Sequence, residues 1–141
     1  MNCIIKNQTL IIPEGTVRIG FRDICEIVHG NPVEEILLPQ TLEVIEDGTF
    51  FDFTEIETIN IPANVKEIGS RAFWGLDRVK ELFVPGTVEQ VKKHAFCNLK
   101  GRLVIACDPQ NLPTGWDAEF AANVKKVCFT AQSNFKSLKY R

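Results

Sequence analysis

The chain has 141 residues, of which 45% are hydrophobic and 24% charged, and its formal net charge is −2. This balance is typical of one globular domain with a sizeable core, and it excludes a largely disordered chain. A broadly basic nucleic-acid-binding surface is not expected at this charge, and no apolar run reaches the ~18 residues of a membrane span. The N-terminal residues lack the basic and then apolar layout of a signal peptide, so we expect a cytoplasmic protein with reduced cysteines.

An internal repeat is marked by four prolines, which are spaced by 26, 23 and 23 residues: Pro13, Pro39, Pro62 and Pro85. Each proline follows an apolar-x-apolar triplet, which predicts a short strand with one buried face. Proline lacks an N–H group, so it is expected where ladder pairing stops. Strands are therefore predicted near residues 9–12, 35–38, 58–61, 81–84 and 104–107, with a further candidate at 124–129.

Three apolar columns follow the prolines in phase. Six residues after each proline the column is Ile19, Ile45, Ile68 and Val91; eleven residues after, it is Ile24, Phe50, Phe73 and Phe96; fourteen residues after, it is Ile27, Phe53, Leu76 and Leu99. A unit of about 23 residues cannot bury such a face alone, but stacked units bury a continuous core. The pattern predicts a solenoid whose aromatic column enters the interior from the wall opposite the strands.

The first repeat is three residues longer than the others, and we place the extra residues in the turn-rich stretch 29–32. Solenoid ends need caps. An edge strand is expected from residues 3–5, and a C-terminal cap near 110–129 that includes Trp116 and Phe120. The domain is thus predicted to span residues 1–129, in about four to five coils, with a loose polar tail at 130–141.

A family resemblance is carried by residues 59–73, which read I-N-I-P-A-N-V-K-E-I-G-S-R-A-F. This segment resembles the BspA-type leucine-rich repeat, and the segments that begin at Pro39 and Pro85 are similar. The resemblance covers about residues 9–129, although Phe53, Leu76 and Leu99 stand where the family has cysteine.

The resemblance, with the preference for right-handed crossovers, implies a short right-handed leucine-rich-repeat solenoid of the α/β type. It would have a parallel β-sheet on one wall and a mostly irregular or short helical opposite wall. The resemblance also implies a role in adhesion or protein interaction. The family is often found at the cell surface or secreted.

Two cysteine–histidine pairs are candidate chemical sites. Cys25 with His29, and His94 with Cys97, could each offer two zinc ligands, but the pairs lie two repeats apart, or roughly 14 Å at one strand spacing per coil. A Cys97 nucleophile with His94 as its base lacks an orienting third residue. We therefore predict no catalytic residue, no metal site and no cofactor, and an enzyme or metal protein built on Cys97 and His94 is the least favoured alternative.

The outward positions of the predicted sheet are the leading candidate for a binding surface. Side chains alternate along a strand, so the residues beside the buried positions point outward. One outward column is mostly apolar, which is typical of a protein contact, although edge elements, the tail or a second copy of the chain could instead cover it. The predicted sheet-face contacts are Glu35, Leu37, Thr58, Asn60, Glu81 and Phe83.

A possible second patch lies directly after the buried aromatic column. Phe51 and Trp74 occupy this neighbouring column in adjacent repeats. Adjacent aromatics on the coil wall would serve as anchors for a partner, and packing between coils is the alternative.

The overall prediction is a non-catalytic protein-binding module with an unidentified protein partner. A self-associating unit that forms a homodimer is the alternative.

Overall fold

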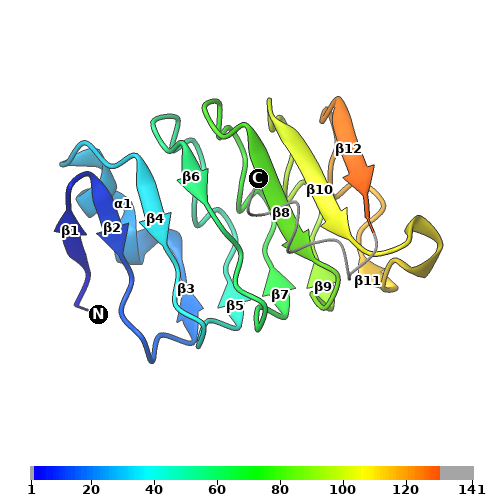
Figure 1. Ribbon diagram of the computed structural model, residues 1–141, viewed down its shortest axis with the longest axis horizontal. Helices are drawn as coiled ribbons and strands as arrows, with labels where there is room; N and C mark the ends of the chain where they lie inside the picture. Colours follow the sequence, from blue (N-terminus) through cyan, green and yellow to red (C-terminus); the bar gives the residue numbers. More distant parts are fainter. Residues whose placement is uncertain (1, 131–141) are drawn as a thin grey trace.

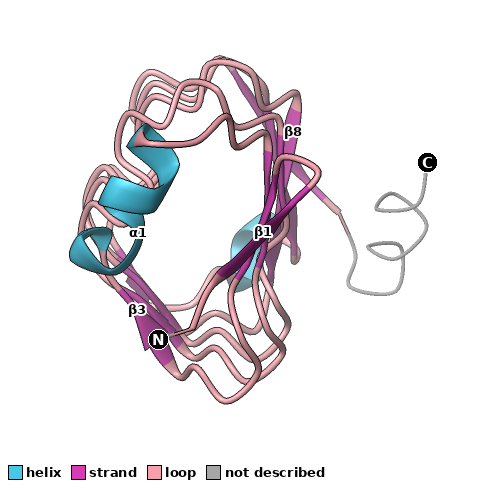
Figure 2. Cartoon of the chain, turned by 90° about the vertical axis from the view of Figure 1, so that its left-hand side faces the viewer, coloured by secondary structure: helices cyan, strands magenta, loops and turns pink. Residues whose placement is uncertain are grey.

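The computed structural model describes residues 2–130, which wind into a solenoid of stacked coils (Figure 1). Viewed along the stack, each coil is a closed loop with strands on two of its walls (Figure 2). The solenoid with a parallel sheet is thereby confirmed. Every coil contributes inward side chains to one continuous core, so neighbouring coils stabilise each other.

The first wall carries the strands that the proline-linked triplets predicted. Two sheets share this wall, with strand orders β1-β2-β4-β6 and β8-β10-β12. All of their pairings are parallel except that of β1 with β2. The strands are β1 (Ile4–Lys6), β2 (Thr9–Ile11), β4 (Glu35–Leu37), β6 (Thr58–Ile59), β8 (Glu81–Pro85), β10 (Arg102–Ala106) and β12 (Lys126–Phe129).

A third sheet, which is entirely parallel, lines another wall, and the sequence analysis did not predict it. Its order is β11-β9-β7-β5-β3. These strands have only two residues each, so no alternation of apolar and polar residues is long enough to reveal them. They are β3 (Arg18–Ile19), β5 (Val44–Ile45), β7 (Glu67–Ile68), β9 (Gln90–Val91) and β11 (Gly115–Trp116).

The aromatic column fills the interior as predicted. Phe50, Phe73 and Phe96 are fully buried. Their ring centroids lie 5.2 Å apart between Phe50 and Phe73 and 5.4 Å apart between Phe73 and Phe96. These separations lie within the range of favourable ring packing, so the column joins successive coils through the core.

The first coil differs from the rest because a helix replaces the turns on its wall (Figure 2). Helix α1 (Phe21–His29) turns Ile24 into the core, and the Asp23 carboxylate accepts a hydrogen bond from the Gly20 N–H at its start. A helix advances only about 1.5 Å per residue against about 3.3 Å for a strand, so this wall needs more residues. The three additional residues of the first repeat are therefore needed by α1 as well as by the turn at 29–32, where we had placed them. A 3-10 helix, η1 (Pro109–Asn111), lies near the other end.

The register of β10 corrects the pairing that the predicted strands at 81–84 and 104–107 imply. The repeat spacing placed Val104 beside Glu81 and Ala106 beside Phe83, but the strands pair Arg102 with Glu81 and Val104 with Phe83. The preceding turn is two residues shorter than its counterpart in the previous coil, with Lys100 and Gly101 in place of residues 77–80. Gly101 permits this shortcut, because a Cβ there would overlap the carbonyl oxygens of Val79 and Lys80. A shift of two residues keeps each side chain on its predicted face.

Both ends of the described chain pack against the terminal coils. At the start, β1 folds back on β2 through Asn7 and Gln8, both of which have positive φ. At the other end, Trp116 is 7% exposed and its indole N–H donates a 2.7 Å hydrogen bond to the Val88 carbonyl. The Phe120 ring lies 5.1 Å from that of Trp116. Apart from Thr130, the loose tail that we predicted at residues 130–141 lies outside the described residues.

Candidate functional site

The outer face of the first wall presents two rows of side chains, which the strand register defines. We call them the polar row and the apolar row. The pairings place Lys6, Thr9 and Glu35 in the polar row, and Ile4, Ile11 and Leu37 in the apolar row. Further along, the polar row contains Thr58, Glu81, Arg102 and Lys126, and the apolar row contains Asn60, Phe83, Val104 and Cys128. Of the six predicted sheet-face residues, Asn60 directly follows β6, and the other five belong to strands of this wall: Glu35, Leu37, Thr58, Glu81 and Phe83.

The apolar row is exposed only in its N-terminal half. Ile4 is 60% exposed and Leu37 is 43% exposed, with the half-buried Ile11 between them. Phe83 is only 8% exposed and Val104 only 4% exposed. Surface available for contact is thus concentrated on β1, β2 and β4, and Phe83 contributes little to it.

The polar row flanks the apolar row with partly paired groups. The Thr9 hydroxyl donates a 3.2 Å hydrogen bond to the Glu35 carboxylate in the next coil. Glu81 forms an ion pair with Arg102, so its carboxylate is already compensated. Thr58 is exposed between these two pairs. A partner on this face would meet an apolar patch that is bordered by hydrogen-bonding groups.

Several members of these rows were not predicted from the sequence, among them Ile4 and Arg102. Ile4 joins the apolar row only because β1 runs antiparallel to β2, and the repeat does not include β1. Arg102 joins the polar row only because of the short turn at Gly101. A glycine directly before Arg102 was the one sequence signal for this change of register.

The second predicted patch exists as an aromatic pair on the wall that follows the buried phenylalanines. Phe51 is 39% exposed and Trp74 is half-buried, with ring centroids 5.9 Å apart. The Arg71 guanidinium carbon lies 5.7 Å from the centre of the Trp74 ring. Cys97, the next residue of this column, is buried. The pair therefore both packs between coils and presents aromatic surface to solvent.

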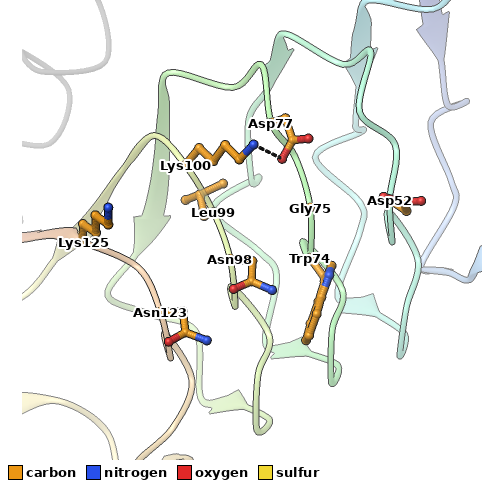
Figure 3. Close-up of a pocket in the computed structure, with 9 residues that line it drawn as sticks. All are labelled: Asp52, Trp74, Gly75, Asp77, Asn98, Leu99, Lys100, Asn123 and Lys125. Carbon is orange, nitrogen blue, oxygen red and sulfur yellow. Dashed lines mark ion pairs between the residues drawn. The ribbon is translucent and has the colours of Figure 1, made fainter.

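Two pockets flank Trp74. A pocket of about 610 Å³, which we call the Trp74 pocket, extends from Trp74 across the next two coils (Figure 3). Its lining includes Asn98, Asn123, Lys100 and Asp77. A second pocket of about 490 Å³ lies on the Phe51 and Arg71 side. Pockets of these sizes fall within the range of small-ligand sites.

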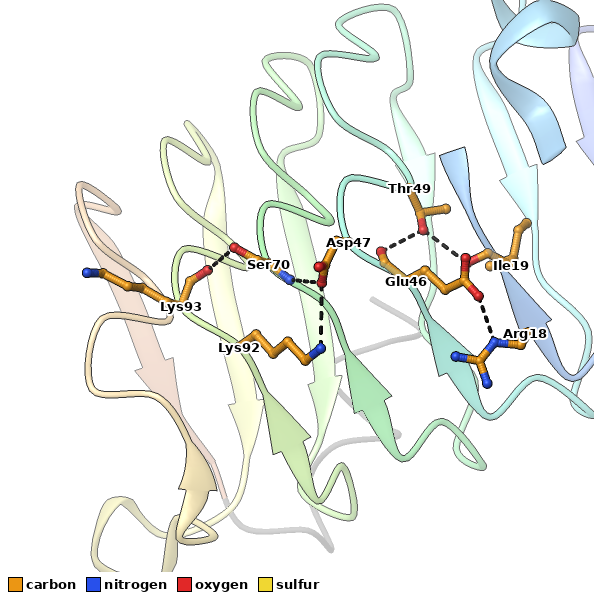
Figure 4. A network of polar contacts seen from close by, with 8 residues as sticks. All are labelled: Arg18, Ile19, Glu46, Asp47, Thr49, Ser70, Lys92 and Lys93. Atoms are coloured by element: carbon orange, nitrogen blue, oxygen red, sulfur yellow. Dashed lines mark hydrogen bonds and ion pairs between the residues drawn. The ribbon is translucent and has the colours of Figure 1, made fainter. Parts of the chain in front are cut away.

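Polar groups near the second pocket mainly hold the coils together (Figure 4). The Asp47 carboxylate accepts a 2.8 Å hydrogen bond from the Ser70 N–H and lies 3.8 Å from the Lys92 ammonium. The Ser70 hydroxyl donates a 2.7 Å hydrogen bond to the Lys93 carbonyl. The two hydrogen bonds link residues one coil apart and the Asp47–Lys92 ion pair links residues two coils apart, so these contacts tie neighbouring coils together.

Among residues 2–130, the structure has no side-chain hydrogen bond between His94 and Cys97. Cys97 is buried. Its backbone N–H donates a hydrogen bond to the His94 carbonyl. His94 Nε2 instead lies 3.5 Å from a Glu119 carboxylate oxygen. Across residues 2–130, no group of three or more His, Cys, Asp or Glu side chains is arranged to hold a metal ion.

The thiols of Cys3 and Cys107 have pKa values raised above that of a free cysteine. Burial is the main cause that raises the pKa of each, and the nearby Asp108 carboxylate raises that of Cys107 further. Such thiols are poor nucleophiles because the thiolate is the reactive form.

Within the described part of the chain, no helix has the length and apolar character to cross a membrane.

Comparison with known proteins identifies the repeat. The family model described as the BspA type leucine rich repeat region matches residues 2–104 and 23–139, with six copies. No curated protein matches the chain. Leucine-rich repeats of this kind are generally protein-interaction modules and are typically not enzymes. The chain belongs to the BspA-type leucine-rich repeat family.

Proposed function

We propose that the protein is a non-catalytic binding module whose partner, another protein, contacts the N-terminal half of the outer sheet face. The observation that carries this proposal is the exposure of Ile4 and Leu37, which lie in register on either side of Ile11. Large apolar side chains adjacent on a sheet surface are typical of contact sites, and solenoid walls form extended binding surfaces.

The polar row supports the same surface. Its Thr9–Glu35 hydrogen bond and the exposed Thr58 border the apolar patch. A contact with an apolar centre and a polar rim is the common anatomy of protein interfaces. Glu35 and Thr58 would form part of that rim, and Phe83 would contribute little because it is only 8% exposed.

Photo-crosslinking tests this proposal directly. A benzophenone amino acid replaces Leu37 in one sample and the exposed Lys66 in a matched control. Crosslinking is carried out in cells that express the protein, and the crosslinked species are identified by mass spectrometry. We expect a defined protein adduct from position 37 and none of the same identity from position 66. Adding Ile4→Asp to the position 37 sample should abolish the adduct, because a charge in the apolar row opposes burial.

The outcomes separate the alternatives. A crosslink between two copies of this chain would favour self-association through the same surface. A position 37 adduct that survives Ile4→Asp, or that forms equally from position 66, would overturn the proposed contact. Circular dichroism of the Ile4→Asp protein checks that it is folded; we expect little loss of stability because Ile4 is 60% exposed.

A further inference from the structure

We propose that the Trp74 pocket is a binding site for a neutral carbohydrate. The site lies on a different wall from the apolar row and goes beyond the proposed protein contact. Its elements are an accessible indole ring, unpaired amide groups opposite that ring, and a lining without excess charge.

The indole of Trp74 provides an apolar platform. Phe51 packs on the N-terminal side of Trp74, one coil earlier, and fixes the position of the ring at a centroid separation of 5.9 Å. The pocket opens on the C-terminal side, toward Asn98 (Figure 3). An amphipathic ring that is held by packing offers a large contact area at little cost in side-chain entropy.

Two amide side chains face this platform from successive coils. The Asn98 amide extends toward Trp74, and that of Asn123 extends toward Asn98 (Figure 3). Both residues have a left-handed backbone, with φ of 60° and 63°, as do Asp52 and Gly75 at the same place in earlier coils. Asparagine adopts this conformation readily. Because the conformation recurs at these four positions in successive coils, the amides lie in line along the stack.

These polar groups are available to a ligand. Among the contacts of residues 2–130, no hydrogen bond involves the Trp74 indole N–H or the side-chain amides of Asn98 and Asn123. Each amide offers one acceptor and two donors, and the indole adds one donor. A ligand on the platform could therefore be bound by several donors and acceptors at once.

The charge of the lining favours an uncharged ligand. The carboxylates of Asp52 and Asp77 are balanced by the ammonium groups of Lys100 and Lys125, and Lys100 lies 3.6 Å from Asp77. No net positive charge is present to hold phosphates, and the Arg71 guanidinium over the Trp74 ring opposes a cationic ligand.

A saccharide matches this combination of groups. One face of a pyranose ring carries C–H groups that can pack on an indole, while hydroxyls at the rim both donate and accept hydrogen bonds. The adjacent amides of Asn98 and Asn123 complement such hydroxyls, and the volume of about 610 Å³ falls within the range of small-ligand pockets. The sugar could belong to a free polysaccharide or to the glycan of a glycoprotein, which share this chemistry.

Nuclear magnetic resonance of the two indole N–H groups tests the proposal. The ¹⁵N-labelled protein is titrated with neutral trisaccharides of β-1,4-linked glucose, β-1,4-linked N-acetylglucosamine and α-linked mannose, and with acidic trigalacturonate as a charge control. Trp116 is an internal reference, because its N–H is buried and bonded to the Val88 carbonyl. We expect at least one neutral sugar to shift the Trp74 signal in a saturable manner without moving that of Trp116.

Matched variants assign the shift to the pocket. Asn98→Ala should weaken binding about tenfold, as loss of one well-formed hydrogen bond does, and Lys66→Ala should leave binding unchanged. Trp74→Phe assigns the indole signal and should retain weakened binding, which is followed by the Asn98 and Asn123 amide signals. A second titration with a neutral glycoprotein, before and after enzymatic deglycosylation, distinguishes the two sources of the sugar.

Three results would overturn the site. They are the absence of any Trp74 shift at millimolar concentrations of all three neutral sugars, equal shifts of both indoles, and binding that Asn98→Ala does not weaken. A stronger response to trigalacturonate than to the neutral sugars would refute the charge argument. The wild-type titration keeps the test decisive even where a variant is poorly folded.

Discussion

Truncation of Phe73 is the sharpest test of how this solenoid is held together. Phe73 is fully buried, and its ring lies 5.2 Å from that of Phe50 and 5.4 Å from that of Phe96. Phe73→Ala removes the buried ring and leaves a cavity between two coils. We expect a loss of about 3 to 5 kcal/mol in the free energy of unfolding.

The magnitude follows from the position of Phe73 in the stack. Each lost ring contact contributes about 0.5 to 1.5 kcal/mol beyond the burial of area, and Phe73 has one such contact on each side. Coils contact mainly their neighbours, so both halves of the solenoid lose part of their shared interface. A domain is stable by only about 5 to 15 kcal/mol, so this single change removes a large fraction of the total.

Urea unfolding followed by circular dichroism measures the effect. With a slope of about 2 kcal/mol per molar urea, the midpoint should fall by about 2 M. The control is Lys66→Ala at an exposed position, which should change stability by less than about 0.5 kcal/mol. Equal urea midpoints for Phe73→Ala and Lys66→Ala would show that the aromatic column does not contribute substantially to the stability of the core.

Two further predictions concern single polar groups. The buried Thr49 hydroxyl lies 2.7 Å from the Glu46 carbonyl oxygen and 3.0 Å from that of Ile19. Thr49→Val should cost about 1 kcal/mol in urea unfolding, because both carbonyls keep a backbone donor, whereas Thr49→Ser should retain most of the stability. A fully stable Thr49→Val protein would contradict this. Burial and Asp108 raise the pKa of Cys107, so the thiolate forms only at higher pH than in a free thiol. Iodoacetamide should therefore modify Cys107 more slowly than an unfolded control at pH 8, as followed by peptide mass spectrometry, and equal rates would argue against the raised pKa.

The sequence by itself determined the repeat, the parallel sheet of the first wall and the aromatic column. These features depend on local patterns: the alternation before each proline and the buried residue eleven positions after it. Stacking identical units then leaves few other ways to bury Phe50, Phe73 and Phe96 together. The six sheet-face residues could be placed on one surface for the same reason, since strand alternation survives a register shift of two residues.

Only the tertiary structure decided which parts of these surfaces are exposed and which groups meet across coils. The antiparallel β1 brings Ile4 beside Ile11, and the short turn at Gly101 brings Arg102 beside Glu81. The pocket beside Trp74 likewise depends on lining residues that are far apart in sequence. A repeat pattern specifies the position of a residue within its coil, but the packing of neighbouring coils and the ends of the stack determine what its side chain contacts.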